Sequence, residues 1–389
     1  MRQRSLQQVR VSVALVFLIH GLIIATWASR IPAFQAQLHL SPAVLGRSLM
    51  MAAIGSVFAM PAAGWLINKF GSLNITIGST LGFCLALPLI AESNTVLRLS
   101  VALFFYGAMA GSMDVAMNTH AVMLEKLFQR HIMSSFHALF SLGGMAGAAL
   151  GGLVASRAVP VGVHFWVSAI ALVAMSLLAF SWLPLPSASA DAGHVASGGT
   201  IGWSVTLGAL ALLAFSIMLV EGAIADWSAI YLRTSVLAGP GLAALGYAVF
   251  SGAMAGGRLT GDYLTGKLGR AHLVCYGALL AAAGLAFVIV FGNAASALVG
   301  FTCAGAGLAT IIPNTFAAAG NIEGSAPGPS LAVVTTAGYA GFLAGPPLIG
   351  FVAQLSSIRA ALWILVVLSG LSAFASTSMK GNSPLGRIP

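Results

Sequence analysis

Residues 107–126 read GAMAGSMDVAMNTHAVMLEK, a largely apolar stretch that contains a carboxylate, Asp114, and an amide, Asn118. Asp114 and Asn118 lie four residues apart, so their side chains share one face of a helix. A charged side chain near the centre of a bilayer costs about 3 kcal/mol or more, and such residues face a cavity or a partner. The stretch therefore predicts a membrane-spanning helix that carries a functional site.

The composition of the whole chain is that of a polytopic membrane protein. Of its 389 residues, 59% are hydrophobic and only 6% are charged, and the mean hydropathy is +0.97. Soluble proteins carry about 25% charged residues. The 46 glycines favour close contact between membrane helices. The formal charge of +9 is scattered over loops, so nucleic-acid binding is not expected and the lipid bilayer is the expected surrounding.

Twelve apolar segments are each long enough to cross a bilayer, which takes about 20 residues. Residues 1–10 are basic, and the apolar run after them has no convincing cleavage site, so we interpret it as a retained first span. If the N-terminus is cytoplasmic, more lysines and arginines lie on the inner side than on the outer side, with Arg258 inside the eighth span. Both termini are therefore predicted to be cytoplasmic. The predicted spans are 11–31, 43–66, 73–92, 97–122, 133–155, 161–183, 204–228, 241–263, 272–293, 296–319, 330–352 and 360–378.

The chain divides near its midpoint into two halves that resemble each other. Residues 184–200, PLPSASADAGHVASGGT, have the composition of a flexible linker. An ordered series of matches at nearly constant spacing relates the segments on either side, as expected of a duplicated transporter fold. We predict an N-terminal six-helix bundle at 1–183, a cytoplasmic linker at 184–203 and a C-terminal six-helix bundle at 204–389. The matches include Gly21 with Gly222, Trp27 with Trp227, Gly111 with Gly307, Asn118 with Asn314, Gly143 with Gly341, Gly147 with Gly345 and Gly152 with Gly350.

The sequence carries no pattern typical of an enzyme or of a cofactor site. Neither a Walker lysine motif nor a GxSxG motif is present. Cys84, Cys275 and Cys303 lie in separate apolar segments without metal or redox spacing. We therefore expect no catalytic activity, no cofactor and no metal.

Two six-helix halves joined by a central loop resemble the major facilitator superfamily. Its loop signature, G-x-x-x-D-R-x-G-R-R in idealised form, follows the second span and recurs after the eighth. The first copy, GWLINKFGS at 64–72, lacks the acid and the final arginine. The second copy, GDYLTGKLGR at 261–270, keeps Asp262, Lys267 and Arg270.

Four further strings are similar to those of a bacterial, fucose-permease-like branch: WASRIP at 27–32, DVAMN at 114–118, MSSFHALFSLGG at 133–144 and GYAGFLAGPPLIG at 338–350. The resemblance implies an all-α fold of twelve transmembrane helices in two pseudosymmetric halves. It also implies that spans one, four, seven and ten line a central cavity, with the substrate bound near mid-membrane.

Asp114, Glu221 and His20 are the predicted proton-coupling residues. Intramembrane acids are functional by default, and desolvation favours the neutral form of a carboxylic acid. The alternative for either acid is a structural ion pair. Related sugar–proton carriers are similar in having acids in spans one and four, whereas here His20 is the titratable group in the middle of span one. In the repeat, Asp114 matches Thr310, so the acid is present in one half only.

Five residues are predicted to bind the substrate: Trp27, Arg30, Asn118, His137 and Asn314. Each has a structural alternative, because tryptophans anchor helix ends, long side chains reach water, and buried histidines and amides bridge helices. Four others are predicted to act in gating. Asp226 would form an ion pair with Arg30 or Arg233, and Asp262, Lys267 and Arg270 would form a charge lock at the inner ends.

The predicted function is secondary active transport of a small polar solute, such as a sugar, across the bacterial cytoplasmic membrane. The mechanism would be alternating access with proton symport, in a protein that we expect to be a monomer. One alternative is proton-driven efflux of drugs or other amphiphilic metabolites, which few cavity charges and abundant Met and Phe would suit. A second alternative is a membrane sensor without transport.

Overall fold

The computed structural model describes residues 6–129, 132–182, 204–322 and 327–376, within which the chain is helical and has no strand. Eleven helical segments there are long and apolar enough to cross a membrane, and the 29-residue α9 packs among them. The predicted all-α fold is therefore confirmed. The predicted linker at 184–203 lies outside the described residues. The helices are α1 (Leu6–Ala28), α2 (Ile31–Gln37), α3 (Pro42–Phe70), α4 (Ser72–Ala91), α5 (Val96–Phe128), α6 (Met133–Ser156), α7 (Val161–Trp182), α8 (Val205–Thr234), α9 (Pro240–Leu268), α10 (Arg270–Phe291), α11 (Ala294–Leu308), α12 (Ile311–Ala319), α13 (Pro327–Leu355), α14 (Ile358–Ala361) and α15 (Trp363–Ala375).

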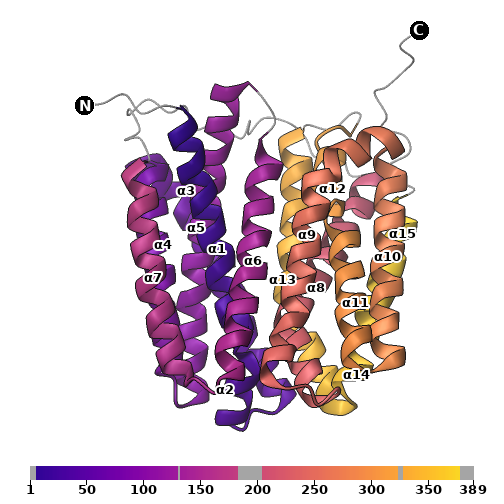
Figure 1. The fold of residues 1–389 in the computed structure, drawn as a ribbon. Coiled ribbons are helices and arrows are strands. Elements are labelled where there is room, and N and C mark those ends of the chain that lie inside the picture. Colours follow the sequence, from indigo (N-terminus) through magenta and orange to yellow (C-terminus); the bar gives the residue numbers. More distant parts are fainter. Residues whose placement is uncertain (1–5, 130–131, 183–203, 323–326, 377–389) are drawn as a thin grey trace.

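Helices α1–α7 form one bundle, and α8–α15 form a second bundle beside it (Figure 1). The long helices run roughly parallel to one another, and α1 begins at the upper end of the view in Figure 1. We call this the upper end of the molecule and the opposite end the lower end. The short helices α2 and α14 lie at the lower end.

Two spans are broken at a proline. Pro32 has no N–H to donate to the carbonyl of Ala28, and the chain turns between α1 and α2. Pro313 likewise has no N–H for the carbonyl of Ala309, and the chain turns between α11 and α12. Together α11 and α12 form the span predicted at 296–319, and the turn interrupts its helix. It falls at Thr310, the residue matched with Asp114.

Repeat-related glycines make the same helix contact in each half. A Cβ added at Gly143 of α6 would lie 2.2 Å from the carbonyl oxygen of Leu18 on α1. A Cβ added at Gly341 of α13 would lie 2.1 Å from the carbonyl oxygen of Phe215 on α8. Only glycine permits backbones to approach this closely. The glycine matches in the sequence therefore mark real pseudosymmetry between the halves.

The two halves meet towards the lower end through a second set of small residues. A Cβ added at Gly350 of α13 would lie 2.5 Å from the carbonyl oxygen of Pro42 and 3.1 Å from the Cα of Gly46, both on α3. On the opposite flank, a Cβ at Gly152 of α6 would lie 2.8 Å from the carbonyl oxygen of Gly241 on α9. Backbone thus packs against backbone at both places. We call this contact the lower seam; it comprises Pro42, Gly46, Gly152, Gly241, Ala244 and Gly350.

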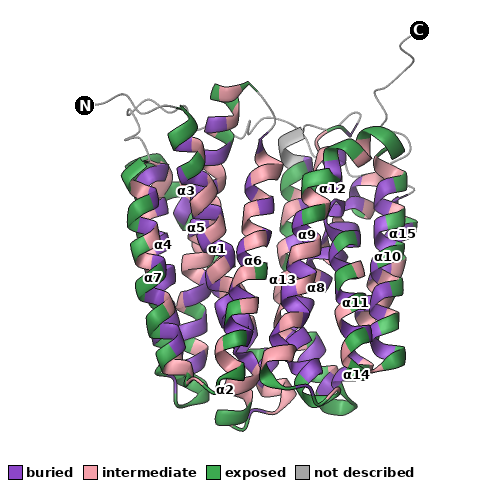
Figure 2. Ribbon diagram, in the orientation of Figure 1, coloured by how far each residue is buried: buried purple, intermediate pink, exposed green. Residues whose placement is uncertain are grey.

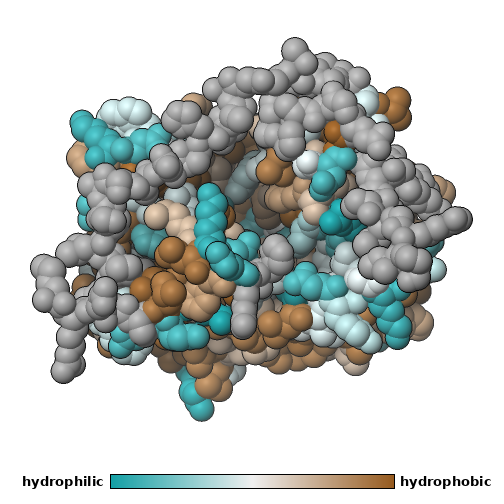
Figure 3. Space-filling model, turned by 90° about the horizontal axis from the view of Figure 1, so that it is seen from above, coloured by the Kyte–Doolittle hydropathy of each residue, from teal (hydrophilic) through white to brown (hydrophobic). Residues whose placement is uncertain are grey.

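The molecule is closed at the lower end and open at the upper end. At the lower end the seam brings α13 against α3 and α9 against α6. Figure 3 looks onto the upper end and shows it hollowed near its middle. This arrangement gives access to the space between the halves from one end.

The outer surface is suited to lipid. Exposed residues lie along the outward sides of the helices in Figure 2, and many of them are large and apolar. Phe58, Leu97 and Ile170, for example, are 72%, 73% and 66% exposed. A soluble protein rarely exposes so much contiguous apolar surface.

Gly350→Ala is expected to lower the apparent midpoint of thermal unfolding in detergent, by the equivalent of about 1–3 kcal/mol, because the new methyl group overlaps the backbone of Pro42. The matched control is Gly78→Ala on α4, where an added Cβ has no neighbour within 4 Å. Equal midpoints for the two variants would contradict the close contact at the lower seam.

Candidate functional site

Asp114 is held by partners from both halves. Its Oδ2 accepts a hydrogen bond of 2.9 Å from the hydroxyl of Tyr339 on α13, and its Oδ1 accepts one of 3.0 Å from the Nδ2 of Asn118. The same Nδ2 donates to the backbone carbonyl of Asp114 at 2.8 Å. The predicted shared face of Asp114 and Asn118 is thus observed, and the carboxylate also links α5 to the opposite half.

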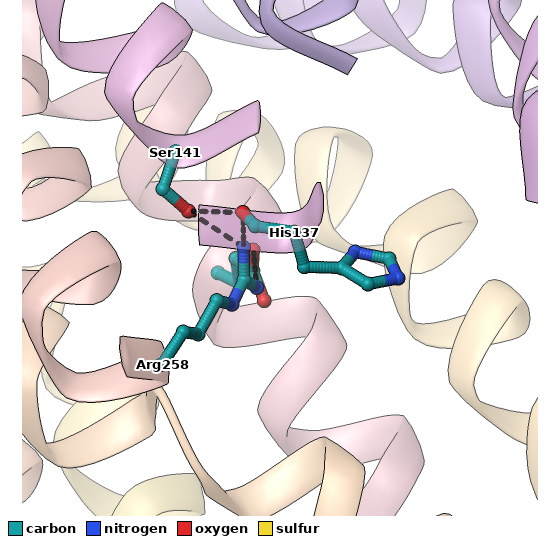
Figure 4. Close-up of polar contacts among 4 residues, drawn as sticks. His137, Ser141 and Arg258 are labelled. Carbon is teal, nitrogen blue, oxygen red and sulfur yellow. Dashed lines mark hydrogen bonds and ion pairs between the residues drawn. The ribbon is translucent and has the colours of Figure 1, made fainter. Parts of the chain in front are cut away.

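Arg258 forms a second link between the halves, from α9 to α6. Its Nη1 donates to the Oγ of Ser141 at 2.7 Å and to the carbonyl oxygen of His137 at 3.4 Å. Its Nη2 lies 3.4 Å from the Oε1 of Glu221 on α8. Figure 4 shows the guanidinium next to Ser141 and the His137 backbone, while the His137 ring points away from it. Glu221 therefore pairs with an arginine of its own half, and that arginine reaches across to the other half.

Asp226 lies in the last third of α8, towards the lower end. The residue is half-buried on α8, within electrostatic range of Tyr106 on α5 and Tyr247 on α9. In the described part of the chain, Asp226 has no hydrogen bond or ion pair, and the hydroxyl of Tyr106 is buried without a partner. These groups could satisfy each other or a bound solute.

The predicted pair of Asp226 with Arg30 or Arg233 is not formed in this structure. Arg30 donates from its Nη2 to the carbonyl oxygen of Val159 at 2.8 Å. Arg233 donates from its Nη1 to the carbonyl oxygen of Ala238. Both arginines thus tie down nearby loops at the lower end.

His20 and Trp27 lie in the interior of the N-terminal half. The His20 ring makes edge contacts with Phe83 and Phe140, at centroid distances of 5.3 and 5.4 Å. Trp27 packs against Phe34 at 5.3 Å. Their side chains are 4% and 3% exposed. The structure does not group these two residues with Asp114 and Asn118.

Asn314 bridges two helices of the C-terminal half. Its Nδ2 donates to the carbonyl oxygen of Thr310 at 2.8 Å and lies 3.3 Å from the Oγ1 of Thr265 on α9. The bond to Thr310 repeats the bond from Asn118 to the carbonyl of Asp114, four residues back. The two matched asparagines therefore share one geometry.

The signature residues on α9 and at the start of α10 are near the upper end. Asp262 and Lys267 are exposed and Arg270 is half-buried. None of the three has an ion pair among the described residues. Their predicted charge lock would require the upper end to close.

Sequence reasoning left Tyr339 and Arg258 out of the candidate site. Arg258 carried a usable signal, because a charge inside a membrane span is a functional candidate by default. Tyr339 carried none, since a tyrosine in an apolar segment is unremarkable until its partner is known. No group of three or more metal-ligating side chains is found in the part of the chain that the structure describes.

Residues 13–322, most of the chain, match the family model described as Major Facilitator Superfamily. The chain belongs to the major facilitator superfamily. It is 38% identical over 368 residues to an uncharacterized MFS-type transporter of Yersinia pestis, covering 92% of each chain. It is also 31% identical to the membrane protein MosC of Rhizobium meliloti, covering 94% of this chain and 88% of MosC. These relatives place it among bacterial transporters of this superfamily.

Solved structures share the fold at low sequence identity. A bacterial homologue of the lysosomal transporter Spinster, in an inward-facing and occupied conformation, matches with a TM-score of 0.77 at 10% identity, covering 96% of each chain. The nucleoside transporter NupG matches with a TM-score of 0.72 at 14% identity, covering 96% of this chain and 98% of NupG. FucP in the outward conformation matches with a TM-score of 0.64 at 16% identity, covering 96% of this chain and 99% of FucP. They confirm the superfamily fold, and the fucose-permease-like branch stays a prediction.

Arg258→Gln is expected to destabilise the protein by about 3 kcal/mol, because it leaves the Glu221 carboxylate without its cation inside the membrane. Adding Glu221→Gln should recover part of that loss, since both charges are then gone. The apparent unfolding midpoints of the two single variants and the double variant in detergent measure this coupling. Strictly additive shifts would contradict the pair.

Proposed function

We propose that this chain is a proton-coupled symporter that moves a small polar solute by alternating access between its two halves. The proposal is supported above all by the Asp114 carboxylate, which lies in a membrane helix and takes a hydrogen bond from the opposite half. An acid in this position can exchange a proton and sense the arrangement of the halves at once.

Asp114 is the leading proton-coupling residue in this proposal. Its partners are two neutral groups, the Tyr339 hydroxyl and the Asn118 amide. No cation neutralises it among the described residues, so it is free to take up a proton. Glu221 is the second candidate. Its contact with Arg258 is 3.4 Å long, and a proton or a polar group of the solute would replace the arginine as its partner. His20 contacts two phenylalanine rings, and its Nδ1 is buried without a hydrogen-bond partner among the described residues, so it has the weakest support of the three.

The solute would bind between Asp114 and Arg258, where both halves offer polar groups. Asn118 and His137 lie next to these charges on α5 and α6. Asn314 on α12 remains a predicted substrate residue, although its amide already bonds Thr265 and the carbonyl of Thr310. Trp27 and Arg30 remain predicted substrate residues, and their burial means that contact with a solute requires the lower end to open. Because the structural neighbour NupG is a nucleoside transporter, nucleosides are tested beside sugars as solutes.

The upper end would face the cytoplasm. This orientation is supported by the excess of lysine and arginine predicted for that side. The hollow in Figure 3 would then be an inward-facing entrance. When this end closes, Asp262, Lys267 and Arg270 would form the charge lock. Opening of the lower end would release Arg30 or Arg233 from its loop and allow it to pair with Asp226. A monomer in the bacterial cytoplasmic membrane suffices for this cycle.

A solute has to be identified first. A thermal-shift screen of the purified full-length protein against sugars, nucleosides and common drugs serves this purpose, because a ligand of the folded state raises its apparent stability. The hits are then tested in lipid vesicles with an imposed pH gradient. Inward accumulation supports symport, and outward movement of a drug without sugar or nucleoside uptake would support efflux instead.

Asp114→Asn is expected to reduce uptake driven by the pH gradient to the level of empty vesicles, because an amide cannot carry the proton. Exchange of labelled for unlabelled solute, which needs no proton gradient, should continue. Glu92→Gln, which changes an exposed acid at the end of α4, is the matched control and should keep wild-type uptake. Gradient-driven uptake that survives Asp114→Asn would overturn the coupling assignment.

A further inference from the structure

Tyr339 makes a contact that spans the two halves. It lies in the middle of α13, half-buried, and its hydroxyl donates to the Oδ2 of Asp114 at 2.9 Å. The two residues are separated by 225 positions in the sequence. Because they belong to different bundles, their distance reports how the bundles are arranged.

The residue matched with Tyr339 in the N-terminal half also has a hydroxyl that makes a hydrogen bond between the halves. Gly143 and Gly341 are matched, so the residue two before each, Ser141 and Tyr339, are matched as well. Ser141 accepts from the Nη1 of Arg258 on α9 at 2.7 Å. One hydroxyl thus donates to an anion of the other half, and its counterpart accepts from a cation of the other half.

Both bonds lie above the lower seam, so a movement about the seam would alter them. At the seam, backbone packs on backbone through Gly350 and Gly152. A pivot there moves groups above it by more than the few tenths of an ångström over which a hydrogen bond keeps its strength. Neither the bond of Tyr339 nor that of Ser141 would keep its geometry when the upper end closes.

Asp114 is isolated from other titratable groups. The side chains that interact with it are Tyr339 and Asn118. Of the elements packed against α5, α3 has its charges, Arg47 and Lys69, near its ends. Other titratable side chains on α5 and its neighbours have their own surroundings: His120 on α5 lies 3.0 Å from the Oγ of Ser72, and Arg10 on α1 lies over the ring of Phe128. His20 on α1 faces Phe83 and Phe140, His137 on α6 faces Phe17, and Cys84 on α4 is buried.

We propose that Tyr339 is the positioning residue that couples protonation of Asp114 to the arrangement of the two halves; this rests on the proposed proton coupling. A hydrogen bond to an ionised carboxylate is roughly twice as strong as one to a neutral acid. Ionised Asp114 therefore favours the arrangement seen here, and a bound proton favours the arrangement that lacks the bond. By linkage, the proton binds less tightly in the state that is open at the upper end, which favours its release there.

The hydroxyl of Ser141 and the guanidinium of Arg258 keep their protons at working pH, although Glu221 next to Arg258 is itself a proton-coupling candidate. A guanidinium stays charged at every working pH. Its bond with Ser141 therefore favours the same arrangement by a constant amount. This makes Ser141→Ala an internal control for Tyr339→Phe.

The test measures how the upper end opens as a function of pH. Spin labels are placed at two exposed residues of opposite halves, Leu127 at the end of α5 and Tyr263 on α9, and their distance distribution is recorded in lipid nanodiscs. The background replaces the native cysteines Cys84, Cys275 and Cys303. In this background, raising the pH from acidic to neutral should increase the ratio of open to closed molecules by about fivefold, the equivalent of one strengthened hydrogen bond.

Tyr339→Phe should remove most of this pH response while leaving the protein folded, because only the hydroxyl is lost. Ser141→Ala should reduce the open population at every pH and leave the pH response intact. If Tyr339→Phe responds to pH like the background while Asp114→Asn does not respond, the role of Tyr339 is wrong and the proton-coupling function stands. If Asp114→Asn keeps the full response, the proton site itself is wrong.

Discussion

Asp114, Glu221 and Arg258 each place a charge within the membrane-spanning part of the chain, where a charge without a partner is expensive. The structure meets this constraint with side chains from more than one helix and from both halves. Asp114 takes the hydroxyl of Tyr339, and Arg258 takes Ser141 and Glu221. Since few other polar groups join the halves within the described residues, the need to satisfy these charges favours some arrangements of the two bundles over others.

Most of the fold could be predicted from the sequence, because the length and hydropathy of a segment are enough to identify a membrane span. The twelve predicted segments agree with the helices to within a few residues at most ends. The break between α11 and α12 was missed, although Pro313 accounts for it, because a proline within an apolar run also fits an unbroken membrane helix, as Pro61 does in α3. The glycine matches were more informative, since each now corresponds to a helix crossing.

For each contact between the halves, the sequence identified one of the two partner residues and not the other. Asp114 and Asn118 share a helix, so their spacing was enough to pair them. Tyr339 lies 225 residues from its partner, and no local pattern marks it. Asp226 was expected to pair with Arg30 or Arg233, but each of these arginines donates to a backbone carbonyl of a nearby loop, which no local pattern shows. The family resemblance places span one at the cavity, whereas aromatic neighbours in the N-terminal half surround His20 and Trp27 in this structure.

The lower seam has a consequence for the speed of transport. Its closest described contacts are made by glycine, alanine and proline, together with Ser156, so backbone packs against backbone there. Separating two interdigitated surfaces would require side chains to leave their packing. Helices that pack through small residues can shift relative to each other with less repacking of side chains. The activation barrier between the two orientations then resides mainly in the few polar bonds above the seam. A carrier built in this way can set its turnover rate through single hydroxyl groups, and its substrate can lower the barrier by replacing them.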